Sequence, residues 1–469
     1  MNPGNAFLEL GSRLRVVRFT ALLACVTSSG CLKTPERSAA SSLDVKTNPP
    51  ASFEYLGKPF CFAGANNYYL AYKPRPMVDD VLQAARALGF PVLRMWSFVD
   101  IGSTDGSVKS IDPHSDSEGK KDGVYFQYWD SKLGRPVYNE GTDGLQRLDY
   151  ALAKAGELGV KLILVLTNNW YDFGGMDQYL SWFGRSKHHE FYTAPEVRAA
   201  YKSYIAHLVN RRNTVNGRLY RDDPTIFSWE LANEPRCKGT GPAGSGWTNR
   251  TIVDWVSEMT SFIRTLDPNH LISVGDEGFL DHGGEHWAYR ANDGVDHEAI
   301  TAVPSVDFGT FHMYPEDWRL GLDRGAQWIV DHVAVARRLG KPTVLEEYGI
   351  KVTRDERGVI TGGLDERLHH YRIWNDALLR NGGNASMVWI LSGLDSAGGL
   401  YEDYDRYTTY RGDETAELLT AYADQFTNDA PACRIQDQTP TADSSPYVRV
   451  RKKRPPIAVV SSGWAFTEG

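Results

Sequence analysis

The chain contains 469 residues, of which 42% are hydrophobic, and it carries a formal net charge of −8 with a sequence pI near 5.9. This length suits one large α/β barrel with insertions and terminal extensions, and the apolar share is sufficient for a sizeable core. The acidic balance argues against a nucleic-acid partner, because proteins that bind nucleic acids usually present a basic face.

The first 31 residues are predicted to be a signal peptide. Three arginines between residues 13 and 18 precede a short apolar run over residues 19–26, and small residues follow. A run of this length is too short to span a bilayer and is typical of a secretory signal. We therefore expect a secreted or cell-surface protein. Cys31 is a candidate lipid anchor of the bacterial lipoprotein type, and Cys25 is a second candidate.

Residues 32–52 are rich in Ser, Ala, Pro and Lys and are predicted to be a linker to the folded domain. The catalytic domain is expected over residues 53–435. A C-terminal tail over residues 436–469 contains the basic cluster Arg449–Arg454, and it is predicted to be peripheral.

Cysteine content excludes a disulfide-rich scaffold, since five cysteines are too few for a chain of this size. Removal of the signal peptide would leave Cys61, Cys237 and Cys433. The sequence permits one disulfide with one free thiol, or three buried thiols.

Short apolar segments alternate with amphipathic helical patterns from Phe53 onward. The strand candidates are Phe60–Ala65, Val92–Trp96, Lys161–Thr167, Ile226–Leu231, Leu271–Gly275, Phe308–His312, Thr343–Glu347 and Met387–Leu391. Eight such alternations predict an α/β fold of the (β/α)₈ TIM-barrel type, as one catalytic domain with loop insertions. An open doubly wound sheet is disfavoured because residues 63–68 lack the glycine spacing of a dinucleotide site, and no cofactor is expected.

Two helices illustrate the pattern. Leu145, Leu148, Leu152 and Ala155 recur at helical spacing, and Gly159 is expected to end that helix. A second helix is predicted to begin with a capping box over residues 193–196. Its buried face would contain Val197, Tyr201, Tyr204, Ile205 and Leu208.

Residues 102–142 show no clear periodicity and are rich in Asp, Ser, Gly and Lys. They follow the second predicted strand, and loops in this position lie on the catalytic face of a barrel. We therefore expect this long loop to form part of the wall of a cleft.

Polar and aromatic side chains gather at the predicted strand ends, where barrel enzymes place their active sites. They are Arg94, Asn168, Asn233, Glu234, His312, Tyr314, Glu347 and Trp389. Two of the strands end in carboxylates followed by Pro or Gly, which suggests a pair of carboxylates that face one substrate. Such a pair is the standard machinery of glycoside hydrolysis. The 13 Trp and 24 Tyr include candidates for stacking on sugar rings, although most are expected to fill the core.

Two further glutamates lie in the same stretches. Glu230 lies too far back along its strand to reach the rim, so a buried ion pair is expected. Glu346 neighbours Glu347, and strand alternation implies that only one of them faces the barrel interior. The residues alone do not decide which one does.

The chain resembles family five of the glycoside hydrolases, and within it the endo-β-1,4-mannanase branch, over most of the region from Phe53 to Asn384. The matching segments are Gly64–Tyr69, Val92–Phe98, Gly144–Tyr150, Asn168–Gly175, Trp229–Cys237, Phe311–Pro315 and Leu345–Gly349. The Asn-Glu-Pro motif is shared across the clan of these enzymes, whereas the Asn-Asn-Trp and Pro-Arg-Cys extensions are more specific. The glycine-rich connection over residues 238–247 departs from the expected shorter loop, so the number of sugar subsites stays open.

The resemblance implies that Glu234 is the acid/base and Glu347 the nucleophile. It also implies that the sugar at the cleaved bond is bound by a set of polar and aromatic side chains. These are Arg94, Asn233, His312, Tyr314 and Trp389, with Trp96, Asn168 and Trp170 along the cleft.

The predicted function is retaining, endo-acting hydrolysis of β-1,4-mannosidic bonds in mannan, glucomannan or galactomannan, with manno-oligosaccharides as smaller substrates. The alternatives are a β-1,4-glucanase or an exo-β-mannosidase of the same fold, and a non-enzymatic carbohydrate-binding surface lipoprotein. No metal site is expected, because no His pairs with Cys or carboxylates at ligand spacing in the sequence. A monomer is expected.

Overall fold

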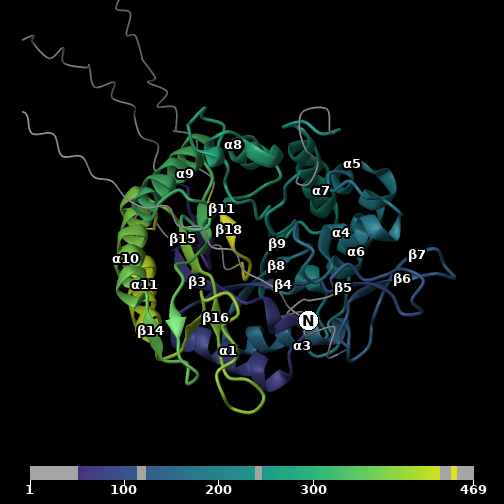
Figure 1. Cartoon of the computed structure of the whole chain (residues 1–469), viewed down its shortest axis with the longest axis horizontal. Coiled ribbons are helices and arrows are strands. Elements are labelled where there is room, and N and C mark those ends of the chain that lie inside the picture. The colour runs from purple at the N-terminus through teal and green to yellow at the C-terminus, as the bar shows by residue number, and fades with distance from the viewer. Residues whose placement is uncertain (1–50, 113–122, 238–245, 434–444, 452–469) are drawn as a thin grey trace, which may run out of the picture. The chain divides into compact units, whose positions relative to one another are not determined.

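The computed structural model describes residues 51–112, 123–237, 246–433 and 445–451. Eight parallel strands form a barrel, and helices surround them (Figure 1). The barrel strands are β3 (Phe62–Asn66), β4 (Val92–Trp96), β8 (Lys161–Val165), β9 (Ile226–Glu230), β10 (Leu271–Ser273), β11 (Gly309–Met313), β12 (Thr343–Tyr348) and β15 (Ala385–Val388). Each of the eight predicted strands is present, with ends shifted by a few residues, and the predicted barrel is confirmed.

The strands follow the order β10-β9-β8-β4-β3-β15-β12-β11. Regular pairing stops between β10 and β11, but single hydrogen bonds cross this seam. The Asp307 amide donates to the Ile272 carbonyl over 2.9 Å, and the His312 amide donates to the Glu277 carbonyl over 3.2 Å. The nearly closed barrel therefore brings all eight strand ends together on one rim.

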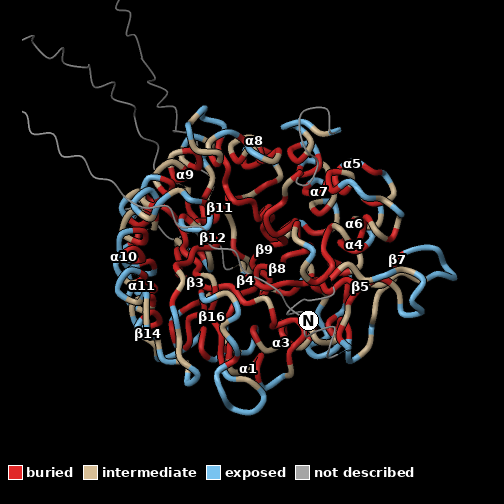
Figure 2. The backbone as a smooth tube through the Cα atoms, in the orientation of Figure 1, coloured by how far each residue is buried: buried red, intermediate tan, exposed pale blue. Residues whose placement is uncertain are grey.

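Buried residues lie on the inner side of the surrounding helices, and exposed residues lie on their outer turns (Figure 2). The helices are α1 (Arg75–Ala87), α3 (Leu145–Leu158), α4 (Gly175–Trp182), α5 (Glu190–Thr193), α6 (Pro195–Val209), α7 (Thr251–Leu266), α8 (His297–Ala302), α9 (Gly325–Leu339), α10 (Leu364–Asn381) and α11 (Glu414–Asp429). Helix α3 ends as predicted, at Gly159 with a φ of 71°. Among the described residues, no helix combines the length and the apolar character needed to cross a membrane.

The predicted capping box of α6 is wrong, although its predicted face is buried. Thr193 belongs to the short helix α5, and its hydroxyl donates to the His189 carbonyl. Ala194 precedes α6 without a side-chain cap, while Glu196 accepts hydrogen bonds from Arg185. Pro195 at the first helical position has no N–H to satisfy, so a capping side chain is less necessary there.

The amino-terminal end of the barrel is closed by an antiparallel sheet of β1 (Phe53–Tyr55), β2 (Lys58–Phe60) and β18 (Arg449–Val450). Phe53 lies 5.3 Å from both Phe227 and Phe308, measured between ring centroids, and all three rings are buried. The prediction of a peripheral tail is therefore wrong for residues 445–451. They return to the barrel because β1 offers a strand edge to pair with and Val448 completes the apolar cluster.

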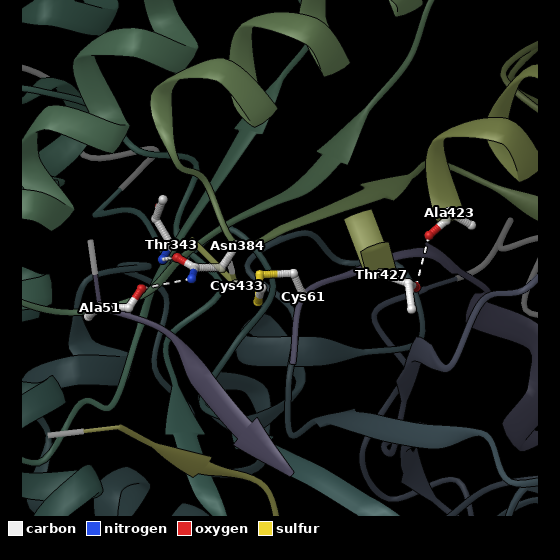
Figure 3. Close-up of a disulfide and its surroundings, with 7 residues drawn as sticks. All are labelled: Ala51, Cys61, Thr343, Asn384, Ala423, Thr427 and Cys433. Carbon is white, nitrogen blue, oxygen red and sulfur yellow. Dashed lines mark hydrogen bonds between the residues drawn. A yellow bond between two sulfur atoms is a disulfide. The ribbon is translucent and has the colours of Figure 1, made fainter. Parts of the chain in front are cut away.

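One disulfide joins Cys61, just before β3, to Cys433, which follows α11 (Figure 3). Nearby, the Asn384 side chain donates to the Ala51 carbonyl and accepts from the Thr343 amide. Cys237 is buried and takes no part in a disulfide. Of the two arrangements that the sequence permitted for the three described cysteines, the structure has the one with a disulfide.

The long segment after β4 contains more structure than its sequence pattern indicated. It forms a three-stranded sheet of β5 (Asp100–Ser103), β6 (Gln127–Asp130) and β7 (Arg135–Tyr138), and the β6–β7 hairpin projects beyond the helices (Figure 1). The expectation of one irregular loop is wrong here. Two shorter pairs, β13 (Thr353–Arg354) with β14 (Ile360–Gly362) and β16 (Leu391–Ser392) with β17 (Thr409–Tyr410), lie in the later loops.

Candidate active site

Glu234 lies just beyond the carboxyl end of β9. After β9, Asn233 forms an isolated parallel β-bridge with Asn168. The next residue, Glu234, has a backbone φ of 50°. Its amide donates to the Gly275 carbonyl over 2.8 Å, which fixes the turn. Non-glycine residues rarely adopt this left-handed conformation. Where the surrounding structure holds one in it, the residue often lies at a functional site.

Glu347 lies near the end of β12, next to a register shift. Phe311 pairs with Leu345, but the next residue, His312, pairs with Glu347, so Glu346 is the extra residue of a bulge. The expectation that only one of the two glutamates faces inward is wrong. The bulge interrupts the alternation of side chains, and both Glu346 and Glu347 contact Arg94.

The two candidate catalytic carboxylates lie close together. One oxygen of Glu234, one oxygen of Glu347 and a ring nitrogen of His312 all lie within 4.8 Å of one another. Carboxyl groups roughly 5–5.5 Å apart are typical of retaining glycosidases, and about 6.5–9.5 Å is typical of inverting ones. The geometry therefore favours a retaining pair.

Arg94 organises the floor of the site. Its guanidinium donates to Glu230 over 2.8 Å, to Asn66 over 3.1 Å, and to Glu347. It also donates over 2.8 Å to the Asn233 side chain, whose amide in turn donates to Asn168 over 3.0 Å. Glu230 is fully buried in this ion pair, as the sequence predicted.

His312 contacts both carboxylates, and Tyr314 contacts Glu347. The Nδ1 of His312 lies 2.9 Å from Glu234 Oε1 and 3.6 Å from Glu347 Oε2. The Tyr314 hydroxyl donates to Glu347 Oε2 over 2.7 Å, and the Trp170 indole donates to Glu234 Oε2 over 2.6 Å. Both oxygens of each catalytic candidate therefore have a polar contact before any sugar binds.

The charges of these groups depend on one another. Burial opposes the charged form of His312, but Glu347, Glu234 and Glu346 raise its pKa well above the ordinary value. Burial also works to raise the pKa of Glu234, yet the His312 contact brings it below the ordinary value. Burial raises the pKa of Glu347, against the opposing effect of His312 and Arg94. These directions favour a proton on His312 over one on Glu234, and the two groups lie within hydrogen-bonding reach of each other.

Aromatic side chains line a cavity of about 490 Å³ above these carboxylates. Trp389 follows β15, and its indole donates to the Asp405 side chain over 2.7 Å. Its ring lies 6.1 Å from Tyr68 and 5.9 Å from Trp96, measured between centroids. Trp96, Asn168, Trp170, Asn233, Glu234, Tyr314, Glu347 and Trp389 all line the cavity, whereas Arg94 and His312 lie beneath it.

Sequence analysis missed a second charged group on the cavity wall. Arg236 donates two hydrogen bonds of 2.5 Å to Glu277 and one of 3.1 Å to Asp293. Burial and the neighbouring Glu234 raise the pKa of Glu277 to about 7. Glu277 follows the end of β10, so the strand-end criterion that found Glu234 also applies to it. The wall further includes Tyr68, Asp172, Phe173, Asp317, Trp318 and Tyr407.

Comparison with known proteins agrees with this geometry. A family model described as "GH family 5 beta-mannosidase-like" matches residues 50–380. The chain is 38% identical over 304 residues to mannan endo-1,4-beta-mannosidase F of Aspergillus clavatus. The matched region covers 64% of this chain and 63% of that relative, so it spans slightly less than two thirds of the relative's length.

Two solved structures are also similar. The hyperthermostable endo-1,4-beta-D-mannanase of Thermotoga petrophila RKU-1 is 40% identical with a TM-score of 0.66, covering 78% of this chain and 99% of that one. The endo-1,4-beta-mannanase of Rhizomucor miehei is 36% identical with a TM-score of 0.70, covering 81% of this chain and 98% of that one.

A (β/α)₈ barrel with two close carboxylates at its strand ends, beneath an aromatic cavity, defines a glycoside hydrolase. The chain belongs to glycoside hydrolase family 5, in its β-mannosidase-like group.

Proposed function

We propose that this protein is a retaining endo-β-1,4-mannanase that acts on mannan, glucomannan or galactomannan. One observation carries the proposal. A carboxylate oxygen of Glu234, a carboxylate oxygen of Glu347 and a ring nitrogen of His312 all lie within 4.8 Å of one another, and the two glutamates line a cavity that also has aromatic walls. The choice of mannan over other β-1,4-linked polysaccharides, and of internal over terminal cleavage, is supported by the similar proteins named above.

In the first step, Glu347 attacks the anomeric carbon as the glycosidic C–O bond breaks. Glu234 takes a proton from His312 Nδ1 along their 2.9 Å contact and passes it to the departing oxygen, so that Glu234 ends this step as a carboxylate beside a neutral His312. Arg94 and Tyr314 hold Glu347 oriented, because each donates to a different oxygen of its carboxylate. The product of this step is a glycosyl ester of Glu347.

In the second step, Glu234 acts as a base. It takes a proton from a water molecule that attacks the anomeric carbon, the ester bond breaks, and Glu347 leaves as a carboxylate. The proton returns to the pair formed by Glu234 and His312. Trp389 would stack on the sugar being cleaved, and Trp96, Asn168, Trp170 and Asn233 would bind its neighbours or its hydroxyls.

A product analysis on defined manno-oligosaccharides, cellulose and an aryl β-mannoside tests the proposal. We expect internal cleavage of manno-oligosaccharides into shorter oligosaccharides, with the β-anomer formed first when the reaction is followed by NMR. A Glu347→Gln variant serves as the inactive control. Stepwise release of mannose would instead indicate an exo-β-mannosidase, and preferential cleavage of cellulose a glucanase. Initial formation of the α-anomer would contradict the retaining mechanism.

We also propose that the protein is exported. The Cys61–Cys433 disulfide supports this, because such bonds form and persist mainly in oxidising compartments. The signal peptide and the candidate anchors Cys25 and Cys31 lie outside the described residues. A monomeric state and a lipid anchor at Cys31 stay predictions.

A further inference from the structure

The turn that carries Glu234 is anchored on both sides by one residue. Before Glu234, the Asn233 carbonyl accepts a hydrogen bond of 3.0 Å from the Asn169 amide. After Glu234, Pro235 has no N–H, so Arg236 offers the first amide that can hold the chain. That amide donates to the side-chain oxygen of Asn169 over 3.2 Å. Asn169 therefore contacts the turn through its backbone on one side of Glu234 and through its side chain on the other.

Asn169 acts on the turn and not on the substrate. Its side chain is fully buried and does not line the cavity. Its neighbour Trp170 does line the cavity and donates to Glu234 Oε2 over 2.6 Å. The same short segment therefore holds both the backbone of the turn and the carboxyl group that the turn carries. The positive φ of Glu234 is costly for a side chain other than glycine, so the turn depends on such contacts to keep its shape.

The orientation of the Asn169 amide is decided by its neighbours. The Arg236 N–H can only donate, so the Asn169 atom that faces it is the oxygen. The same oxygen lies 2.9 Å from His188 Nε2, which must carry a hydrogen for this bond to form. If the amide were turned over, its NH₂ group would face the Arg236 N–H and that bond would be lost. The NH₂ group has no partner among the described residues, so the two bonds to the oxygen hold the side chain in place.

His188 is held in turn by Asp177 on α4. The distance from His188 Nδ1 to Asp177 Oδ1 is 2.6 Å, and the imidazole is buried. Whether the proton at that contact lies on Asp177 or on His188, Nε2 keeps its hydrogen, because the Asn169 oxygen can only accept. Both ring nitrogens are therefore hydrogen-bonded, which fixes the orientation of the ring. Asp177, His188 and Asn169 form a chain of hydrogen bonds that leads from α4 to the catalytic turn.

We propose that Asn169 is a positioning residue for the acid/base Glu234, and that His188 and Asp177 hold Asn169 in place for this role. The effect on turnover rests on the proposed glycosidase function, whereas the chain of hydrogen bonds does not. A shift of the turn would move the Glu234 carboxyl group away from the glycosidic oxygen, and a small misplacement of a catalytic group costs much of its rate. Glu347 lies on another strand, so the attack on the anomeric carbon would be affected less.

The expected defect depends on the leaving group of the substrate. A sugar hydroxyl is a poor leaving group and needs a proton from the general acid, whereas a dinitrophenolate departs without one. Displacement of Glu234 should therefore slow the cleavage of manno-oligosaccharides and leave the cleavage of a dinitrophenyl β-mannotrioside nearly unchanged. A substitution that only destabilises the fold lowers the active fraction of the protein, so it reduces both reactions equally.

The test measures kcat/KM of variants on mannohexaose and on the dinitrophenyl β-mannotrioside. For Asn169→Ala we expect a loss of about 10–100-fold on mannohexaose, which is part of what a general acid contributes, and of less than about threefold on the aryl substrate. His188→Leu removes the donor to Asn169 and should show the same selectivity with a smaller loss. His188→Gln has an amide that can still donate, so its kcat/KM values should lie closer to those of the unmodified protein.

Asn384→Ala is the matched control. The Asn384 side chain is also buried and also accepts from a backbone amide, that of Thr343, but it lies at the opposite end of the barrel. Its removal should destabilise the fold and leave the ratio of the two kcat/KM values unchanged.

Equal losses on the two substrates in Asn169→Ala, or an equally selective loss in Asn384→Ala, would overturn the proposal. If Asn169→Ala does not fold, the same ratio in His188→Leu decides the question. NMR of protein labelled with ¹⁵N in histidine gives a readout that needs no substrate. The His188 Nε2 signal, identified by its absence from His188→Gln, should carry a hydrogen, and an Nε2 without one refutes the chain of hydrogen bonds. Failure of the unmodified protein to cleave either substrate, with that hydrogen present, refutes only the proposed function.

Discussion

The two ends of the barrel bury opposite kinds of side chain, although the same eight strands form both. At the carboxyl ends, the strands bury four carboxylates, an arginine and a histidine under an aromatic cavity. At the amino ends, the rings of Phe62, Phe227 and Phe308 lie beneath a small sheet, which contributes Phe53 to the same apolar cluster. One end concentrates charge that is costly to bury, and the other concentrates the apolar contacts that stabilise the fold.

This difference indicates that activity and stability are largely separable here. Paired buried charges contribute little net stability, because desolvation offsets their attraction. Fully buried phenylalanines contribute several kcal/mol each. Substitutions at the catalytic end should therefore change turnover more than unfolding, and substitutions at the opposite end should do the reverse.

The largest effect is expected at the catalytic carboxylates. Glu347→Ala should reduce kcat by about 10⁴-fold or more, and Glu234→Ala by about 10²–10⁴-fold on an ordinary leaving group. Azide should restore turnover of an activated aryl β-mannoside in both, giving an α-azide with Glu347→Ala and a β-azide with Glu234→Ala. NMR of the azide products checks the two roles, and exchanged configurations would reverse our assignment.

The apolar end should give the next largest effect, on the free energy of unfolding. Phe308→Ala is expected to lower it by about 3–5 kcal/mol, because the ring is fully buried among Phe53 and Phe227. Denaturant unfolding measures this, with Leu133→Ala at the exposed tip of the β6–β7 hairpin as the control. A loss of kcat in the folded fraction of Phe308→Ala would show that the two ends are not separable.

Removal of the disulfide should act in the same direction. The double variant Cys61→Ser/Cys433→Ser should unfold about 2–5 kcal/mol more easily, because the bond closes a loop between residues 372 positions apart. Reductant should destabilise the unmodified protein and have no further effect on the double variant. Cys237→Ala, which removes the thiol outside the disulfide, should remain sensitive to reductant.

A smaller effect is expected at the support of Trp389. Asp405→Leu would leave the indole N–H without its 2.7 Å acceptor, and KM for manno-oligosaccharides should rise about tenfold. Asp405→Asn retains an acceptor oxygen and should have a weaker effect. Steady-state kinetics separate KM from kcat, and equal changes in the two variants would contradict a hydrogen-bonding role.

The smallest effect concerns metals. Glu234, His312 and Glu347 lie close enough to hold a cation, but each already hydrogen-bonds to neighbouring side chains. We therefore expect activity to be unchanged after dialysis against EDTA. A loss restored by a divalent cation would show that the site binds a metal.

Local sequence patterns were sufficient to predict much of the fold. Apolar runs at strand spacing predicted all eight barrel strands, and Gly159 predicted the end of α3, because these features depend on neighbouring residues. The capping box at Thr193 failed since the short helix α5 takes up that residue. The tail strand β18 and the sheet of β5–β7 were missed because their pairing joins segments distant in sequence or too short to show a period.

The same division holds for the site. The sequence by itself determined that Glu234 and Glu347 stand at strand ends, because a strand that stops at a carboxylate before Pro or Gly is a local pattern. Only the tertiary structure decided that Glu346 also turns inward, that Arg236 pairs with Glu277, and that Cys61 pairs with Cys433. A bulge, an ion pair and a disulfide each depend on which strands become neighbours, and barrel closure fixes those neighbours.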